Sequence, residues 1–450
     1  MPEMRKSMKN ELFESMPVPK AYMKLAVPVM MSSVLMLVYN MFDMYFIAGT
    51  GNTDLVAGVS LCAPVFTFLI AVGDIFGIGG SSVISRLFGA GRTDDGRRLS
   101  VFAFLGSAAV GIIIAAVLLL FQNPMLTLLG ATEQTMQFAR SYYFWIALGA
   151  PFIIFSLVPT NLLRTEGFAT GAMIGSFIGS IVNMILDPVF IFTLGMGAGG
   201  AAIATVIGNV FADLFYVYFI TQRSSLLSLN PKGFHISGQE LGQILGIGIP
   251  SSITNIMQSV GVMLLNRFLL PYGNDKIAVM GIVSKIVMIV VMIMVAFSFG
   301  GQPLYGYLYG SKNKPRLRET IRFAYLLVCG LGIGISAVLF FAAPVLISLF
   351  MNDASVISTG VPMLRAILCG MPFIGYTMVT TCIFQSAGKA RGALLLSAGR
   401  QGYIYAVVLF AASALFGYNG VIAAQPAADC LTAVLAFILF RLYLGNELSD

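Results

Sequence analysis

The stretch VFAFLGSAAVGIIIAAVLLLFQNPMLTLLGAT runs from Val101 to Thr132 without a charged residue. About 20 apolar residues are enough for a helix to cross a bilayer, so this run is long enough to do so. The runs from Phe323 to Asn352 and from Gln401 to Ala428 are also free of charge. Of the 450 residues, 58% are hydrophobic and 10% charged, whereas about 25% of a soluble domain is charged. This composition excludes an ordinary soluble enzyme and predicts a polytopic membrane protein.

Apolar runs separated by charges, glycines and prolines predict the number of spans. Twelve helices are expected, at residues 22–48, 55–82, 99–121, 136–162, 168–194, 199–221, 241–270, 277–308, 320–350, 357–386, 391–416 and 420–443. We therefore expect an all-α fold with twelve transmembrane helices.

Lysine and arginine residues gather in alternate loops between the predicted helices. One such loop carries Arg92, Arg97 and Arg98, whereas the connections at 49–54, 122–135, 193–198, 352–356 and 417–419 carry none. The positive-inside rule places both termini in the cytoplasm, and we expect a multi-pass protein of the bacterial inner (plasma) membrane. This topology explains the net charge of +7 without a nucleic-acid partner. We also expect no cleavable signal peptide, because polar, basic residues precede the first span.

The two halves of the sequence match at a spacing of 220 to 222 residues. The matches are Pro28 with Pro250, Gly51-Asn52 with Gly273-Asn274, Gly79-Gly80 with Gly300-Gly301, Leu87-Phe88-Gly89 with Leu308-Tyr309-Gly310, Pro151-Phe152 with Pro372-Phe373, Gly167 with Gly388, and Gly200 with Gly420. Six spans per repeat predict two lobes related by a pseudo-twofold axis along the membrane normal. We expect an N-lobe at 1–221, a cytoplasmic loop at 222–240 and a C-lobe at 241–450. This arrangement favours a transporter that works by alternating access over a channel or an enzyme.

Enzyme chemistry finds little support in the sequence. It contains no GxxxxGK[ST] phosphate loop and no HExxH motif, and its single histidine, His235, lies in the predicted loop between the lobes. The five cysteines all lie inside apolar runs and include no CxxC pair, so no metal site or disulfide framework is indicated. We expect no catalytic residues and no cofactor.

Ionisable residues inside membrane spans are costly and become candidates for function. At 1.5 Å per residue, Asp43 lies about 28 Å from Lys24 and Asp187 about 31 Å from Glu166, which places both at a similar depth in the outer half. Thr205 reaches about the same level, and Asn183 shares a helix face with Asp187. Pro188 frees a backbone carbonyl and predicts a kink there. These oxygens predict a site for a proton or a small cation such as Na⁺, with no other metal.

A structural role for the two carboxylates is the alternative, with Asp43 capping a helix and Asp187 forming a hydrogen bond at the proline kink. The repeat argues against it, because the second lobe has the same architecture without acids at the corresponding positions, Leu265, Ile404, Val408 and Gln425. We therefore favour a function confined to the first lobe.

Three charged residues of the second lobe, Lys285, Arg400 and Asp429, fall at one depth. We expect them to form a mutually neutralising cluster, with a second coupling or substrate site as the alternative. Asp74 and Asp213 lie deeper toward the cytoplasm. They either line the inward cleft or pair with loop arginines, and both interpretations stay open.

Bulky, adaptable side chains suit the binding of cationic amphiphiles, and Tyr39, Met288 and Met292 are the candidates for substrate contact.

These residues resemble the multidrug and toxic compound extrusion (MATE) transporters of the MOP superfamily, in particular the MepA-type bacterial branch close to the DinF-like group. The motifs that carry the resemblance are Pro28 with Asp43, Gly79-Gly80 followed by Ser85-Arg86-Leu87-Phe88-Gly89, the run from Asn183 through Asp187-Pro188 to Phe192, and the loops Arg164-Thr165-Glu166-Gly167 and Gln385-Ser386-Ala387-Gly388. The resemblance implies two six-helix bundles and cation-driven export of organic compounds. It also implies a first-lobe cation site at Asp43, Asn183, Asp187 and Thr205.

The major facilitator superfamily has the same helix count, but its loop signature is only partly met by residues 89–98. Our hypothesis is a monomeric antiporter that exchanges H⁺ or Na⁺ for a small organic, cationic amphiphilic substrate within the lipid bilayer. A flippase for lipid-linked saccharides is the alternative within the superfamily, and a channel or a membrane enzyme is the alternative outside it.

Overall fold

The computed structural model describes residues 11–351 and 353–449, and all regular elements within these ranges are helical. The chain divides into two compact units. Of the described residues, the first unit contains 11–16 and 28–252, and the second contains 17–27 together with 253–351 and 353–449. The first turns of one long helix thus group with the second unit, whereas the predicted lobes, 1–221 and 241–450, assign them to the first. The fold class predicted from the sequence is confirmed.

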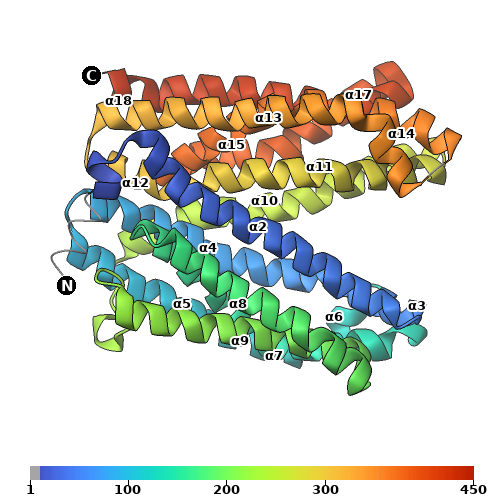
Figure 1. Ribbon diagram of the computed structural model, residues 1–450, viewed down its shortest axis with the longest axis horizontal. Coiled ribbons are helices and arrows are strands. Elements are labelled where there is room, and N and C mark those ends of the chain that lie inside the picture. The colour runs from blue at the N-terminus through green and yellow to red at the C-terminus, as the bar shows by residue number, and fades with distance from the viewer. Residues whose placement is uncertain (1–10, 352, 450) are drawn as a thin grey trace. The chain divides into compact units, whose positions relative to one another are not determined.

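The first unit is organised around one long helix, α7. Its elements are η1 (Glu11–Ser15), most of α2 (Val18–Gly49), α3 (Thr53–Leu61), α4 (Ala63–Gly89), α5 (Thr93–Leu120), α6 (Gln122–Leu128), α7 (Glu133–Thr165), α8 (Ala169–Pro188), η2 (Val189–Thr193), α9 (Gly197–Arg223), η3 (Pro231–Gly233) and the start of α10 (Gly238–Leu269). α7 packs against α4, α5 and α9, and α8 packs against α9 (Figure 1). Buried side chains of α7 such as Tyr143, Ile146 and Ile154 form the centre of this core.

The second unit is organised around α15 in the same way. Its elements are the rest of α10, η4 (Leu270–Tyr272), α11 (Asn274–Gly300), α12 (Gln302–Gly310), α13 (Lys314–Phe350), α14 (Ala354–Cys369), α15 (Met371–Ser386), α16 (Ala390–Ala398), η5 (Gly399–Tyr403), α17 (Ile404–Phe440), η6 (Arg441–Gly445) and α18 (Asn446–Ser449). α15 packs against α11, α13 and α17. Within the repeat, α14 and α15 together correspond to α7.

The described residues contain ten helices long and apolar enough to cross a membrane, or eleven when the bent pair α14 and α15 counts as one span. The last of these, Ala390–Gly445, has 56 residues, about 84 Å of helix, which is far more than a hydrocarbon core of about 30 Å. It contains Gly417 at φ +55°, a conformation that suits glycine. Close by, a Cβ on Gly420 would stand only 1.9 Å from the Ala412 carbonyl oxygen. The chain therefore reverses here, which divides the segment into the eleventh and twelfth spans.

Two glycine pairs that match in the repeat allow helices to approach closely. A Cβ on Gly79 of α4 would lie 2.4 Å from the carbonyl oxygen of Ile244 in the first turns of α10. In the second unit, a Cβ on Gly300 would lie 2.4 Å from Cα of Ala26 in the first turns of α2. The first pair thus allows close helix packing. These approaches explain why each unit takes in the start of a helix from the other half of the sequence.

Large apolar side chains also cover the outside of the helices. Ile112, Ile113 and Leu120 of α5 are 61%, 61% and 77% exposed, which suits contact with lipid and not with water. The predicted spans lie within the observed helices to about one residue, but three of them are interrupted. The second predicted span is divided at Cys62 into α3 and α4, the eighth is divided at Gly301 into α11 and α12, and the tenth is bent by 40° between α14 and α15.

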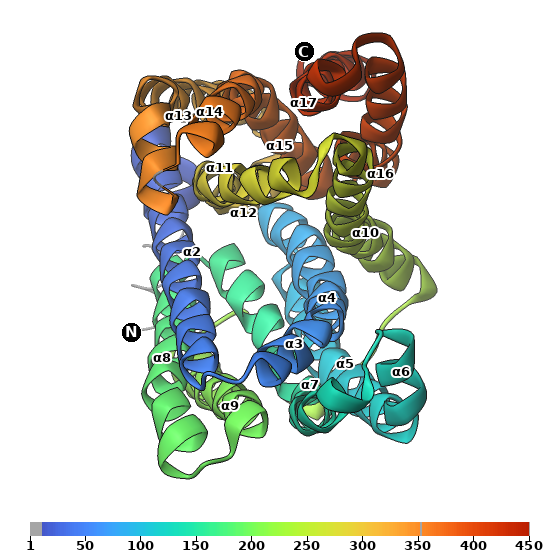
Figure 2. The ribbon, with the colours of Figure 1, turned by 90° about the vertical axis from the view of Figure 1, so that its right-hand side faces the viewer.

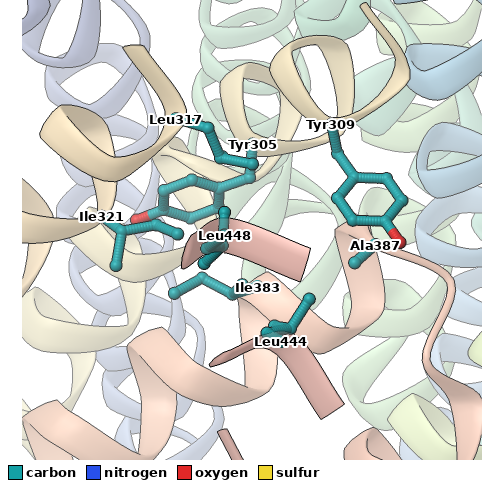
Figure 3. A pocket seen from close by; sticks show the side chains of 8 residues that line it. All are labelled: Tyr305, Tyr309, Leu317, Ile321, Ile383, Ala387, Leu444 and Leu448. Carbon is teal, nitrogen blue, oxygen red and sulfur yellow. The ribbon is translucent and has the colours of Figure 1, made fainter. Parts of the chain in front are cut away.

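The C-terminal segment packs against α12 and the loop after α15 in the second unit. Leu444 and Leu448 line a small apolar pocket with Tyr305, Tyr309, Leu317, Ile321, Ile383 and Ala387 (Figure 3). Beside this pocket, Glu447 accepts hydrogen bonds from Tyr309, at 2.7 Å, and from Lys389. These contacts fix the last described turns of the chain to α12 and to the loop after α15.

Candidate functional site

Small residues bring α8 and α9 close together in the first unit. A Cβ on Gly208 of α9 would lie 2.6 Å from the carbonyl oxygen of Gly179 and 3.2 Å from Cβ of Asn183, both on α8. The two helices lie side by side in both views of the molecule (Figure 2). Asn183 and Asp187 are one turn apart on α8 and are both buried, as is Thr205 on α9. The short separation therefore presses the polar face of α8 against Thr205.

The amide of Asn183 connects the two helices. Its Nδ2 donates to Oδ1 of Asp187 at 3.4 Å and lies 3.3 Å from Oγ1 of Thr205, to which it also donates. Asp187 is completely buried, and Asn183 and Thr205 are 2% and 4% exposed. The structure thus brings together three of the four residues predicted for the cation site.

Asp43 on α2 is the fourth predicted residue and is partly buried. It lies near enough for its charge to act on Asp187. Tyr39, one turn earlier on α2, lies near enough to Thr205 and to both carboxylates for all three side chains to act electrostatically on its hydroxyl. Tyr39 was predicted as a substrate contact, but its position places it beside the candidate cation site.

Tyr142 of α7 is a member of this cluster that the sequence analysis missed. Its side chain is 9% exposed, and the charges of Asp43 and Asp187 both act on its hydroxyl. The sequence feature that could have pointed to Tyr142 is its hydroxyl group inside an apolar span, about 13 Å from the start of α7. The cluster therefore has contributions from four helices, α2, α7, α8 and α9.

Three buried oxygen atoms of the cluster have no hydrogen-bond partner among the residues that the structure describes, namely Oδ1 of Asp43, Oδ1 of Asn183 and Oδ2 of Asp187. Each buried unpaired polar atom carries a desolvation penalty of about 1–3 kcal/mol. Carboxylate, carboxamide and hydroxyl oxygens are the ligands that a hard cation prefers, and a carboxylate also accepts a proton. The site therefore has unpaired acceptor oxygens. No basic residue of the described chain donates a hydrogen bond to them.

Pro188 changes the form of the helix that carries this cluster. α-Helical hydrogen bonding ends at Pro188, which has no N–H, and the chain continues as one π-helical turn, η2. A Cβ on Gly200 of α9 would lie 2.8 Å from the carbonyl carbon of Phe190 in this turn. The proline thus marks the transition to a π turn directly after Asp187.

The second unit contains a different charged group. Nε of Arg400 in η5 lies 3.1 Å from Oδ1 of Asp429 on α17, and Nε2 of Gln425 donates to the same oxygen at 3.2 Å. Asp429 is completely buried and Arg400 is 8% exposed. Lys285 was predicted to share this cluster, but its side chain is exposed on α11 and forms no ion pair with a residue that the structure describes. The reason is that equal depth does not place two side chains on facing sides of their helices.

Of the two methionines predicted to contact substrate, Met288 is 56% exposed and Met292 is partly buried. Both lie on α11, and no interaction of either with a polar group distinguishes it among the described residues. Their role in substrate binding stays a prediction.

Comparison with known proteins shows the family. The MatE family model matches residues 28–189 and 250–410, the two halves of the internal repeat. The multidrug export protein MepA of Staphylococcus aureus (strain NCTC 8325 / PS 47) is 31% identical over 430 residues, which is 96% of this chain and 95% of that protein. A MATE protein solved in complex with MaD3S has a TM-score of 0.92 at 26% identity, covering 98% of this chain and 99% of that one. MATE in the straight conformation has the same TM-score and coverage at 25% identity. The chain therefore belongs to the MatE family of multi-pass membrane proteins, which are secondary transporters and not enzymes.

Proposed function

We propose that this protein is a cation-coupled antiporter that exports organic, cationic amphiphilic compounds by alternating access, acting as a monomer in the inner membrane. The observation that carries the proposal is the pair of Asp187 and Asp43 in the first unit, whose unpaired carboxylate oxygens lie beside the unpaired Oδ1 of Asn183 and the hydroxyl of Thr205. The multidrug export named for the relatives supports the class of substrate.

The coupling ion is H⁺ or Na⁺. A proton would bind to Asp187 and remove a charge that is costly to bury, whereas Na⁺ would be held by the oxygens of Asp43, Asn183, Asp187 and Thr205. In either case the ion changes the net charge between α2, α8 and α9. The π turn after Pro188 is the point at which α8 can respond, because its backbone hydrogen bonds differ from those of a regular helix.

One coupled charge is enough to drive useful export. Moving one elementary charge through 100 mV supplies about 2.3 kcal/mol, which corresponds to roughly a 50-fold concentration ratio. Export against a moderate gradient therefore does not require a second coupling site.

The test is efflux of a fluorescent cationic dye from proteoliposomes, with H⁺ and Na⁺ gradients imposed separately. The wild type should export dye under one of the gradients, and Asp187→Asn should abolish this export while the folded protein is retained. Asp54→Asn is the matched control, since it also removes a carboxylate from the first unit but at an exposed position. Gradient-driven efflux that persists in Asp187→Asn would overturn the assignment.

A further inference from the structure

A second buried carboxylate in the first unit, Asp213 on α9, lies outside the candidate cation site. Its side chain is 7% exposed, and its Oδ1 accepts a hydrogen bond of 2.5 Å from the hydroxyl of Ser156 on α7. Its other oxygen, Oδ2, is buried and has no hydrogen-bond partner within residues 11–351 and 353–449. The carboxylate is thus only half satisfied inside a membrane-spanning helix, where an unpaired acceptor is most costly.

Asp213 lies closer than the cation site to the end of the unit that carries the basic loops. It is ten residues from Arg223, about 15 Å of helix, whereas Thr205 is about 27 Å from the same residue. The two acids are thus separated along the membrane normal, by about 12 Å from the level of Thr205 to that of Asp213.

Hydroxyl groups continue from Asp213 toward the basic end. The charge of Asp213 acts on Tyr216, one turn further along α9. The Tyr216 hydroxyl donates to the Ala172 carbonyl oxygen at 2.9 Å and lies 3.0 Å from the Thr160 hydroxyl and 3.1 Å from that of Ser176. Arg164, near the end of α7, acts electrostatically on both Tyr216 and Asp74. Groups from α4, α7, α8 and α9 therefore form a polar track inside an otherwise apolar bundle.

The matching helices of the second unit pack without these groups. The positions that correspond to Asp213 and Tyr216 hold Ala433 and Ala436, which are both buried between α17 and its neighbours. Thr377 corresponds to Ser156, but its hydroxyl donates to the carbonyl oxygen of Phe373 on its own helix. The contact between the central helix and the last helix therefore needs neither a carboxylate nor a hydroxyl donor across the interface.

We propose that Asp213 is a second proton-binding site of the first unit, and that it unloads the coupling proton toward the side that carries the basic loops. The inference rests on the proposed antiport and requires that its ion be H⁺. The proton leaves the Asp187 carboxyl group, crosses the gap along α9 through water, and binds the free Oδ2 of Asp213. It then passes to water at the end of the unit that carries the basic loops, beside Tyr216, Thr160 and Ser176. Only the proton moves, and each carboxyl group returns to a carboxylate.

The test uses membrane vesicles of known orientation, right-side-out and inverted, with dye transport measured while the pH on each side is varied alone. The wild-type rate should depend on the pH of both compartments. Asp213→Asn should lower gradient-driven transport by about 100-fold, the low end of what a positioned proton-transfer group contributes. It should also lose the dependence on pH at the side of the basic loops and keep the dye affinity of the wild type.

A matched pair of variants covers the case in which Asp213→Asn does not fold. Ser156→Ala retains the carboxylate but removes its donor, and should shift the pH dependence at the basic-loop side by about one unit, because a hydrogen bond to a carboxylate stabilises its charged form. Thr377→Val, its counterpart in the second unit, should leave that dependence unchanged.

The outcomes separate the two proposals. A wild type that shows no gradient-driven transport contradicts the antiport itself. A wild type driven by H⁺, together with an Asp213→Asn variant that keeps both pH dependences, overturns only the role of Asp213. Transport driven by Na⁺ alone also overturns the role of Asp213 and leaves the antiport standing.

Discussion

Each unit buries a carboxylate, Asp187 on the helix beside its last long helix and Asp429 on the last long helix itself, but the two acids have different partners. Asp187 in the first unit receives one hydrogen bond of 3.4 Å from the neutral amide of Asn183. Asp429 in the second unit receives hydrogen bonds from Arg400 and from Gln425, the residue that corresponds to Thr205. Two similar bundles thus contain an acid that has only a neutral partner and an acid that is paired with an arginine. A buried charge becomes a candidate for ion coupling only when its counter-charge is missing.

The largest expected effect follows from removing that counter-charge. Arg400→Met should lower the free energy of unfolding by about 3–5 kcal/mol, because it leaves Asp429 buried and unpaired. Asp187→Asn should lower it by much less or raise it, since no ion pair is lost. Denaturation of the purified variants in detergent measures both changes.

The double variant Arg400→Met with Asp429→Leu is the control, and it should recover most of the lost stability, since replacing a buried pair by apolar residues is often close to neutral. If Arg400→Met were as stable as the wild type, the distinction between the two acids would fail.

A second contrast concerns the central helices. α7 continues through Pro151, whereas the corresponding α14 and α15 are bent by 40° just before Pro372. A Cβ on Gly111 of α5 would lie 2.6 Å from Cα of Pro151. At the matching position in α13, a Cβ on Gly332 would lie 2.9 Å from Cε of Met294, the flexible end of a side chain. The first unit is therefore the more tightly packed of the two at this point.

Alanine substitution at these two glycines tests that difference. Gly111→Ala should destabilise the protein by about 1–3 kcal/mol, because the clash is with backbone that cannot shift alone. Gly332→Ala should cost less, since a methionine side chain can change rotamer. Thermal unfolding of the two variants, compared under the same detergent conditions, gives the order. Equal losses would mean that the bend in the second unit does not reflect looser packing.

Much of the fold could be predicted because hydropathy and the repeat act over many residues at once. The charge-free runs located the spans, and Gly417 separated the last two as expected. The interruptions at Cys62 and between α14 and α15 could not be predicted. They depend on which residue of a neighbouring helix meets the backbone. A Cβ on Gly370, for example, would lie 3.1 Å from Cα of Pro426.

The candidate site was predictable where its residues share one helix. The spacing of Asn183 and Asp187 determines that they face the same way, and depth placed Thr205 beside them. Depth alone failed for Lys285, because it contains no information about the direction of a side chain around its helix axis. Tyr142 was missed for the opposite reason, since a tyrosine inside an apolar span has no distinctive spacing.

The smallest contrast concerns how each unit fastens the segment that follows its last helix. In the first unit, buried Glu166 after α7 accepts from the backbone N–H groups of Ser225, at 2.8 Å, and Leu226, at 3.1 Å, and from the Ser224 hydroxyl. In the second unit, Lys389 after α15 donates to Glu447, which also accepts from Tyr309. In the first unit the acid is Glu166, on the loop after the central helix. In the second unit the acid is Glu447, on the segment after the last long helix, and its contact with Lys389 is the more exposed of the two.

Glutamine substitutions should reflect that difference in exposure. Glu166→Gln should cost about 1–3 kcal/mol, because the buried side chain loses one of the two oxygens that accept hydrogen bonds, whereas Glu447→Gln should cost about 0.2–1 kcal/mol. Although burial opposes the shift, hydrogen bonds from Lys389 and Tyr309 hold the pKa of Glu447 below its usual 4.5, and the bond to Glu447 raises the pKa of Lys389. The stabilisation by the Lys389–Glu447 ion pair is therefore fully present between the ordinary pKa values of the two groups. It is lost as pH falls through the lowered pKa of Glu447 or rises through the raised pKa of Lys389. Hydrogen exchange of the C-terminal segment as a function of pH measures this, and exchange in Glu447→Gln should lack the acid-side transition. A transition that persists in the variant would assign it to another group.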